Sequence, residues 1–234
     1  MTRHELKEQL QHDQFTDAVS RSVDYVTLHR QAVIRWAVAA VLILAIAGAV
    51  FWYTSHRRAV RQQNLQAAFD VLDAQVGPAT TPGVKTFPTQ EAKTQASIKA
   101  LSQVVDKDGN STEGLIARYY RGTLEASQNN AKAAEADLRA VASSKSGVAA
   151  LSKIALAQLL AAQNKVPEAQ ELLRSVVNNP NGLVSKDQAQ ILLARLDESA
   201  NPQQAKKVLQ SLRGPNQRPA VSRAVDTLTA DLSK

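Results

Sequence analysis

Apolar residues recur along most of this chain at spacings of three or four, with polar residues between them, which is typical of amphipathic helices. The segment 1–35 follows this pattern with the apolar positions Leu6, Leu10, Phe15, Val19, Val23 and Val26. The same period returns in several segments beyond residue 53, and Gly and Pro separate them. The pattern predicts an all-α fold that begins with an N-terminal amphipathic segment over 1–35.

One segment departs from this pattern because it is apolar on every side. Residues 36–53 are 18 residues without a charge, and as a helix they extend roughly 27 Å, close to the ~30 Å hydrocarbon core of a bilayer. Trp36 lies at one end and Trp52 with Tyr53 at the other, where aromatic rings favour the two membrane interfaces. We predict a transmembrane helix over 36–53, with these three aromatic residues as its membrane anchors.

Two other interpretations of this segment are weaker. A cleaved export signal is compatible with Ala45, Ala47 and Ala49, but a signal has a short basic region before its apolar stretch, and here 35 residues precede it. A buried core helix needs apolar surroundings on all sides. The rest of the chain is too polar to provide them.

Residues 54–112 form a predicted helical connector with the first helices of the soluble domain. Helical periods cover 59–76 and 90–105, and the segment 77–89 between them contains three Pro and two Gly, the composition of a loop. Asp106-Lys107-Asp108-Gly109 resembles the opening of a calcium loop, but the glycine comes too early for one. We interpret it as a turn between helices.

Residues 113–234 repeat themselves. The segments 120–141, 154–176 and 191–212 align so that Ala134, Ala169 and Ala205 coincide, at steps of 35 and 36 residues. A large apolar residue follows each alanine after four residues and another after seven; they are Leu138, Val141, Leu173, Val176, Leu209 and Leu212. Asn129, Asn164 and Asn201 fall in the turn of each unit.

This period and this small-to-large spacing indicate tetratricopeptide helix hairpins. The alanine lets the second helix of each hairpin approach the first, and the large residues fill the seam between them. Since one hairpin cannot bury its apolar face alone, the units are expected to stack into a solenoid with a concave inner surface. A last helix after Pro219 is expected to cap the stack. The predicted fold is therefore a single transmembrane helix followed by a tetratricopeptide-like solenoid.

The composition excludes most catalytic chemistry from the repeats. The chain has no Cys, and all four His precede residue 57, so residues 57–234 have no Cys or His nucleophile, base or zinc ligand. A carboxylate pair could still act as acid and base, but Glu168/Glu171 and Asp197/Glu198 are more simply interpreted as solvated charge on helix surfaces. No glycine-rich phosphate loop occurs. We expect no catalytic residue, no cofactor, no metal and no small-molecule substrate, and no enzyme.

The net charge of +7 does not indicate nucleic-acid binding. Beyond the predicted span the basic residues are scattered, and aromatic residues, 4% of the chain, do not alternate with them. A stacking platform for bases is therefore missing, and protein partners remain the expected ligands.

The first helix of each hairpin lines the groove of such a solenoid, so Tyr119, Thr123, Gln158 and Arg195 are predicted to point inward and to bind a partner. Tyr119 could stack on or hydrogen-bond a bound chain. Arg195 could hold a carboxylate. An ordinary surface role for all four residues stays open.

Three features carry a resemblance to a known family: the order of short segment, single span and repeats; WYTSHRRAVRQQNLQAAFDVL at 52–72; and ILLARL at 191–196 with QAKKVLQSLRG at 204–214. The chain resembles the ancillary SecYEG translocon subunits, the YfgM-type membrane-anchored tetratricopeptide proteins. The resemblance implies a single-pass protein of the bacterial inner membrane with a cytoplasmic N-terminus and periplasmic repeats. It also implies partners at the translocon and a periplasmic chaperone or prolyl isomerase that receives exported chains.

The residues themselves leave two alternatives open. Arg21, Arg30 and Arg35 before the span balance Arg57, Arg58 and Arg61 after it, so charge does not orient the anchor and a repeat adaptor facing the cytoplasm is possible. The second alternative is a structural assembly protein that oligomerises through small residues of the span: Ala40, Ala45, Ala47, Gly48 and Ala49.

Overall fold

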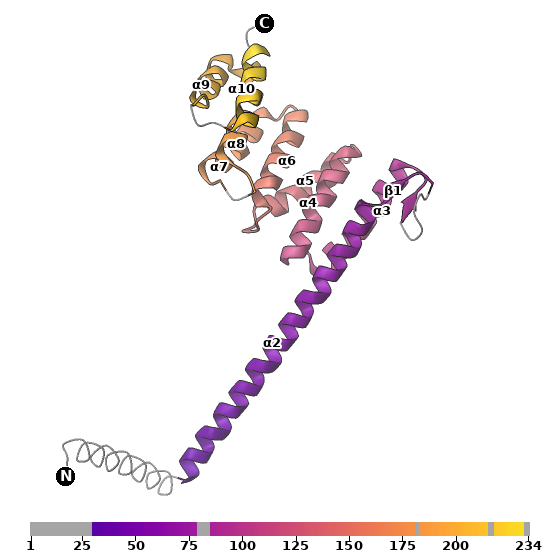
Figure 1. The fold of residues 1–234 in the computed structure, drawn as a ribbon, viewed down its shortest axis with the longest axis vertical. Coiled ribbons are helices and arrows are strands. Elements are labelled where there is room, and N and C mark those ends of the chain that lie inside the picture. The colour runs from indigo at the N-terminus through magenta and orange to yellow at the C-terminus, as the bar shows by residue number, and fades with distance from the viewer. Residues whose placement is uncertain (1–29, 79–84, 181–182, 215–217, 232–234) are drawn as a thin grey trace, which may run out of the picture. The chain divides into compact units, whose positions relative to one another are not determined.

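The computed structural model describes residues 30–78, 85–180, 183–214 and 218–231 (Figure 1). Most of the predicted N-terminal segment, residues 1–29, lies outside them. The chain divides into two compact units, 1–59 and 60–234, which we describe separately. Helix α2, Arg30–Leu72, begins in the first unit and ends in the second.

The first unit, in its described part, is the apolar portion of α2. Its side chains are exposed, with 77% of Trp36 and 70% of Trp52 accessible. One 18-residue stretch has a mean hydropathy of 2.3 and no buried residue. By length and composition, α2 is the one helix among the described residues that could cross a membrane. This exposure contradicts the buried-core interpretation.

The second unit is almost entirely helical. After α2 come α3 (Gln90–Asp108), α4 (Thr112–Ser127), α5 (Ala131–Ala142), α6 (Ala149–Ala162), α7 (Val166–Asn178), α8 (Lys186–Ala200), α9 (Pro202–Ser211) and α10 (Pro219–Asp231). Two short strands, β1 (Gln75–Val76) and β2 (Thr86–Phe87), pair in parallel. The predicted all-α fold class is confirmed.

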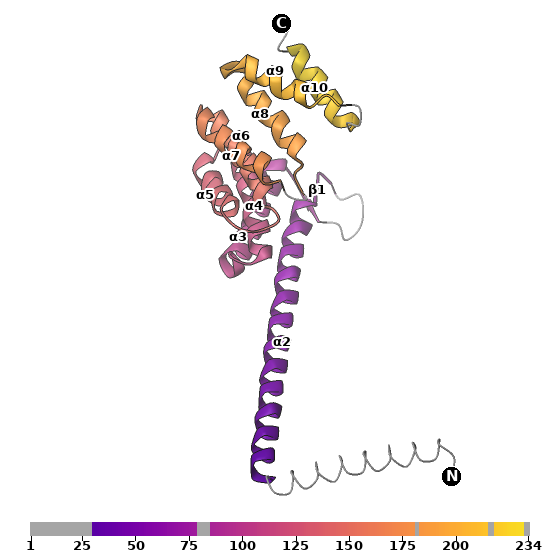
Figure 2. The same cartoon turned by 90° about the vertical axis from the view of Figure 1, so that its left-hand side faces the viewer.

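Consecutive helices pack against each other from α3 to α9, and α10 packs on α8 and α9 (Figure 2). The pairs α4/α5, α6/α7 and α8/α9 are the three hairpins that the sequence repeats predict. The end of α2 packs on α3 through Leu65 and Ala68, with Leu101 and Val104 opposite. This pair precedes the predicted repeats and is a further helix pair in the same stack.

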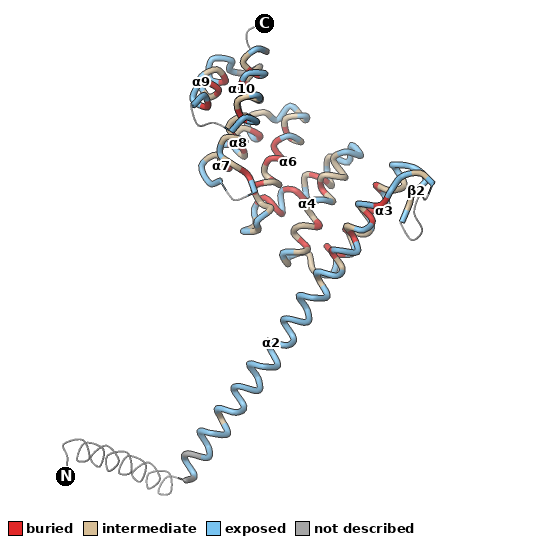
Figure 3. The backbone as a smooth tube through the Cα atoms, viewed as in Figure 1, coloured by how far each residue is buried: buried red, intermediate tan, exposed pale blue. Residues whose placement is uncertain are grey.

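Most buried residues of the second unit lie where neighbouring helices pack together, including the seams of the hairpins (Figure 3). Ala134, Ala169 and Ala205 are fully buried, as the repeat alignment predicts. The first helices also carry buried small residues, at Gly122, Ala157 and Ala194, which the alignment of the second helices did not single out. A Cβ on Gly122 would lie 2.9 Å from Leu138 Cγ, so glycine is required there by the close approach of α4 and α5.

The hairpin turns explain two of the three repeated asparagines. Asn129 and Asn164 have φ values of 60° and 61°, the left-handed region that asparagine tolerates better than most residues. Each turn closes with paired backbone bonds of the Schellman type, such as Asn130 N to Glu125 O at 2.9 Å and Lys165 N to Leu160 O at 2.8 Å. Asn201 differs, because its φ is −149°. It is the N-cap of α9, and its side-chain oxygen accepts a hydrogen bond from the backbone N–H of Gln204.

Two predicted boundaries are wrong. The helix expected to reach Val76 ends at Leu72, because residues 75 and 76 bond to the segment before α3 as β1. The helix expected to end at Val105 continues to Asp108. The amino-acid composition of a segment does not show that it pairs with a segment farther along the chain, as β1 does with β2.

Candidate protein-binding surface

Three of the four predicted partner-binding residues occupy equivalent positions. Thr123, Gln158 and Arg195 each follow directly after a buried small residue of the seam, on α4, α6 and α8. A residue next to a seam residue is turned by about 100° from it, so each of these side chains points to the same side of its own hairpin. Helix α4 also contacts α6 directly, which places the Thr123 and Gln158 positions on neighbouring first helices.

The three side chains differ in what they can offer a partner. Gln158 and Arg195 are exposed, and Arg195 forms no ion pair with any described residue. The Thr123 hydroxyl donates to the backbone oxygen of Tyr120 at 2.8 Å. Because this bond uses the single donor of Thr123, only its acceptor capacity remains for a partner.

Tyr119 is more closely packed than a simple binding residue. It is half-buried against the core cluster formed by α5 to α8, and its ring meets the edge of Tyr120 at 5.2 Å between centroids. Tyr120 in turn contacts Phe69 of α2 at 5.0 Å. Burial, with a smaller contribution from Tyr120, raises the pKa of Tyr119, so its hydroxyl keeps its proton at neutral pH and can donate.

The structure also contains a buried charged network that was not predicted. Asp137 of α5 is 5% exposed, and Arg121 of α4 donates to its two carboxylate oxygens at 2.6 and 2.7 Å. Arg121 also donates to Ser102 Oγ at 3.1 Å, and Arg118 lies 3.4 Å from Asp137. The hydrogen bond to Asp137 raises the pKa of Arg121. The network therefore joins α3, α4 and α5.

One sequence signal could have revealed this network. Asp137 comes three residues after Ala134 and one before Leu138, so it falls on the apolar face of its helix. A charge on such a face requires a partner, since an unpaired buried carboxylate is strongly destabilising.

The expectation that Asp197 is solvated is wrong. Asp197 is 3% exposed and accepts from Gln170 Nε2 at 2.5 Å. Burial raises its pKa, and Arg174 and the Gln170 bond oppose this shift. Glu168 and Glu171 are exposed, as expected. The tertiary contact of α7 with α8 buries Asp197, and helix periodicity alone does not show it.

The raised pKa of Asp197 predicts a pH-dependent stability. The folded protein holds this proton more tightly than the unfolded chain, whose carboxyl titrates near its ordinary value of 3.8. Stability is therefore lost as the pH rises from below that value toward the folded pKa. We expect Asp197→Asn to raise the melting temperature near pH 7, because the amide keeps an acceptor for Gln170 without the buried charge.

The gain should shrink when both chains are melted near pH 3, where Asp197 is protonated in both states. The matched control is Glu171→Gln, an exposed carboxyl of α7, which should change little at either pH. Equal effects of Asp197→Asn at both pH values would contradict this explanation.

The described residues offer no metal site, since no three His, Cys, Asp or Glu side chains gather among them.

Comparison with known protein families identifies the kind of domain. The family described as tetratricopeptide repeat-like domain matches residues 30–182, more than half of the chain. No curated protein matches the chain, and no solved structure does. Repeat domains of this kind are typically scaffolds for protein–protein interaction rather than catalysts. The chain belongs to the tetratricopeptide repeat-like domain family.

Proposed function

We propose that this protein is a membrane-anchored scaffold that binds protein partners at the secretion translocon and helps to pass exported chains to a chaperone. The observation that carries the proposal is the combination of a fully exposed apolar helix with a tetratricopeptide repeat-like domain in one chain. We propose binding rather than catalysis as its activity; residues 57–234 contain neither Cys nor His, two of the commonest catalytic side chains.

The contacts at the end of the apolar stretch are consistent with an interfacial anchor. Trp52 stacks on His56 with ring centroids 5.7 Å apart, and the Arg57 guanidinium lies 5.7 Å from the Tyr53 ring centroid. Aromatic rings whose faces contact polar or cationic groups suit the headgroup region. We propose residues 36–53 as the span, 54–112 as the connector and 113–234 as the repeats with their cap.

The orientation and the partners follow from the resemblance described above. We propose a single-pass protein of the bacterial inner membrane with its N-terminus in the cytoplasm and its repeats in the periplasm. Its partners are then the SecYEG-type translocon and a periplasmic chaperone or prolyl isomerase. Tyr119, Thr123, Gln158 and Arg195 are the proposed contact residues, with Gln158 and Arg195 the most accessible.

Photo-crosslinking from this surface tests the proposal. A photoreactive residue at position 158 or 195, in the full chain in intact cells, should capture translocon subunits, a periplasmic chaperone or exported chains. The matched control is position 136, since Ala136 is also exposed but lies on the second helix α5. We expect several-fold less capture from position 136.

The identity of the captured proteins separates the alternatives. Capture of only this chain supports a structural assembly protein, and capture of cytoplasmic proteins supports an adaptor of inverted orientation. Equal capture from positions 136, 158 and 195 would contradict the assignment of this surface.

A further inference from the structure

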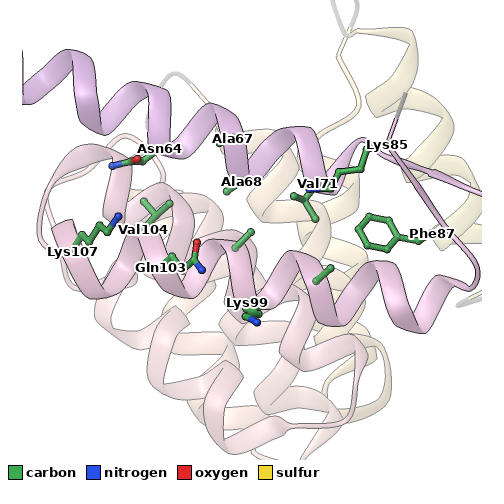
Figure 4. A pocket seen from close by; sticks show the side chains of 12 residues that line it. Asn64, Ala67, Ala68, Val71, Lys85, Phe87, Lys99, Gln103, Val104 and Lys107 are labelled. Atoms are coloured by element: carbon green, nitrogen blue, oxygen red, sulfur yellow. The ribbon is translucent and has the colours of Figure 1, made fainter. Parts of the chain in front are cut away.

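A groove lies between the last turns of α2 and helix α3 (Figure 4). All its lining residues belong to the second unit, and the cavity holds about 370 Å³. The two helices run in opposite directions along it, with Phe87 at one end. It is separate from the Tyr119, Gln158 and Arg195 positions, none of which lines it.

The floor of the groove is made of small apolar side chains. Ala96, Ala100 and Val104 follow each other at intervals of four along α3, and Ala67 and Val71 lie opposite on α2. Small residues at helical spacing let another helix approach closely. The floor therefore has the character of the seams inside the repeats, where Gly122, Ala157 and Ala194 lie.

The rim of the groove is basic. Lys99 and Lys107 lie on α3 with Gln103 midway between them, and Lys85 lies just before β2. All three lysines are exposed. No Asp or Glu lines the groove, and no described carboxylate forms an ion pair with these lysines. The positive charge is thus available to a partner.

The position of the groove in the helix stack indicates which kind of secondary-structure element can pack over it. Helix α4 packs on α3, and the α3 side chains in that core include Leu101 and Val105. Neither residue lines the groove, while Ala68 and Val104 belong to both the core and the groove. At the far end of the stack, α10 packs on both helices of the hairpin α8/α9. A helix is therefore the element that this fold lays over a helix pair.

We propose that the α2/α3 groove is a second docking site, and that its occupant is an acidic amphipathic helix of a protein partner. Lys99 and Lys107 are eight residues apart, about 12 Å along α3. A matching occupant has an apolar stripe over about three turns, with Glu or Asp seven or eight residues apart beside it. This site does not depend on the proposed role of the inner surface.

The test uses a fluorescent 18-residue helical peptide with Leu and Ala on one face and Glu beside them, titrated with the full chain in detergent micelles. Fluorescence anisotropy should show saturable binding of this peptide and none of the same peptide with Lys in place of Glu. The double variant K99E/K107E should bind at least tenfold more weakly, since two attractions become repulsions. The matched control K132E/K145E changes the net charge equally at exposed lysines outside the groove and should bind as the native chain does.

A third variant tests whether peptide binding needs the shape of the groove or only its positive charge. Ala67 is exposed on α2 and lines the floor, so Ala67→Trp should fill the groove and abolish binding without changing any charge. The proposal is overturned if the acidic peptide does not bind at millimolar concentration. It is also overturned if K132E/K145E weakens binding as much as K99E/K107E, or if Ala67→Trp has no effect.

Two further outcomes distinguish this site from the rest. Self-association lost in K99E/K107E, without peptide binding, would show that a second copy of the chain is the occupant and would overturn the proposal. Variants at Gln158 and Arg195 should leave peptide binding unchanged. Failure of the crosslinking test above would therefore not contradict the groove proposal. Failure of the peptide test would likewise not contradict the proposed function.

Discussion

Ala169→Asp is expected to unfold the repeats while leaving the apolar helix able to enter a membrane. Ala169 of α7 is fully buried in the core cluster that α5, α6, α7 and α8 share. A carboxylate there has no room and no cation of its own, and burying an unpaired charge costs several kcal/mol. Since a domain is stable by only about 5–15 kcal/mol, we expect a loss of about 5 kcal/mol.

Circular dichroism of the full chain in detergent measures this effect as the loss of a cooperative thermal transition. The control is Ala136→Asp, which places the same charge at an exposed position of α5 and should shift the transition by only a few degrees. Resistance to alkaline extraction from membranes should be unchanged in both variants, because it depends on the apolar part of α2. A normal melt of Ala169→Asp would mean that the assigned register of α7 is wrong.

Asp137→Ala is expected to lower the free energy of unfolding by about 3 kcal/mol, because it leaves the largely buried guanidinium of Arg121 without its partner. Arg121 has 19% of its side chain exposed and Asp137 has 7%, so water replaces the lost bonds poorly. The variant also removes the acceptor that lies 3.4 Å from Arg118. Denaturant unfolding of the full chain in detergent measures the loss.

The ion pair Arg213–Asp226 supplies the control. Its nitrogen and oxygen are 3.0 Å apart, but the side chains are 54% and 69% exposed. Exposed pairs contribute about 0–1 kcal/mol, so Asp226→Ala should cost less than about 1 kcal/mol. The double variant Arg121→Met/Asp137→Leu should recover much of the stability lost in Asp137→Ala, since no unpaired charge remains. Equal losses of unfolding free energy in Asp137→Ala and Asp226→Ala would show that burial does not determine how much an ion pair stabilises this fold.

The helices could be predicted because their signals are local. The period of three to four residues and the spacing from Ala134 to Leu138 depend only on neighbours along one helix, and both survive in the structure. The turn asparagines are partly predictable for the same reason. Asn129 and Asn164 share one backbone conformation, while Asn201 is an N-cap, a difference that follows from the shorter turn before Pro202.

For the candidate surface, the sequence predicted only which helix positions are equivalent. Residues that are one repeat apart occupy the same place in successive hairpins. The first helices therefore have equivalent positions at Thr123, Gln158 and Arg195. The period does not show that the Thr123 hydroxyl is already bonded to its own helix. It also does not show that Tyr119 packs against a core cluster, since both facts depend on contacts in three dimensions.

The amino-acid sequence by itself determined the apolar segment of bilayer length, the paired helices, their seam alanines and the absence of Cys and His from the repeats. Only the tertiary structure decided that Asp137 and Asp197 are buried, that the end of α2 joins α3 in the stack and that the groove is basic on its rim and apolar on its floor. The physical reason is that periodicity records which side of a helix is apolar. Burial of a charge depends on which other helix packs on that side.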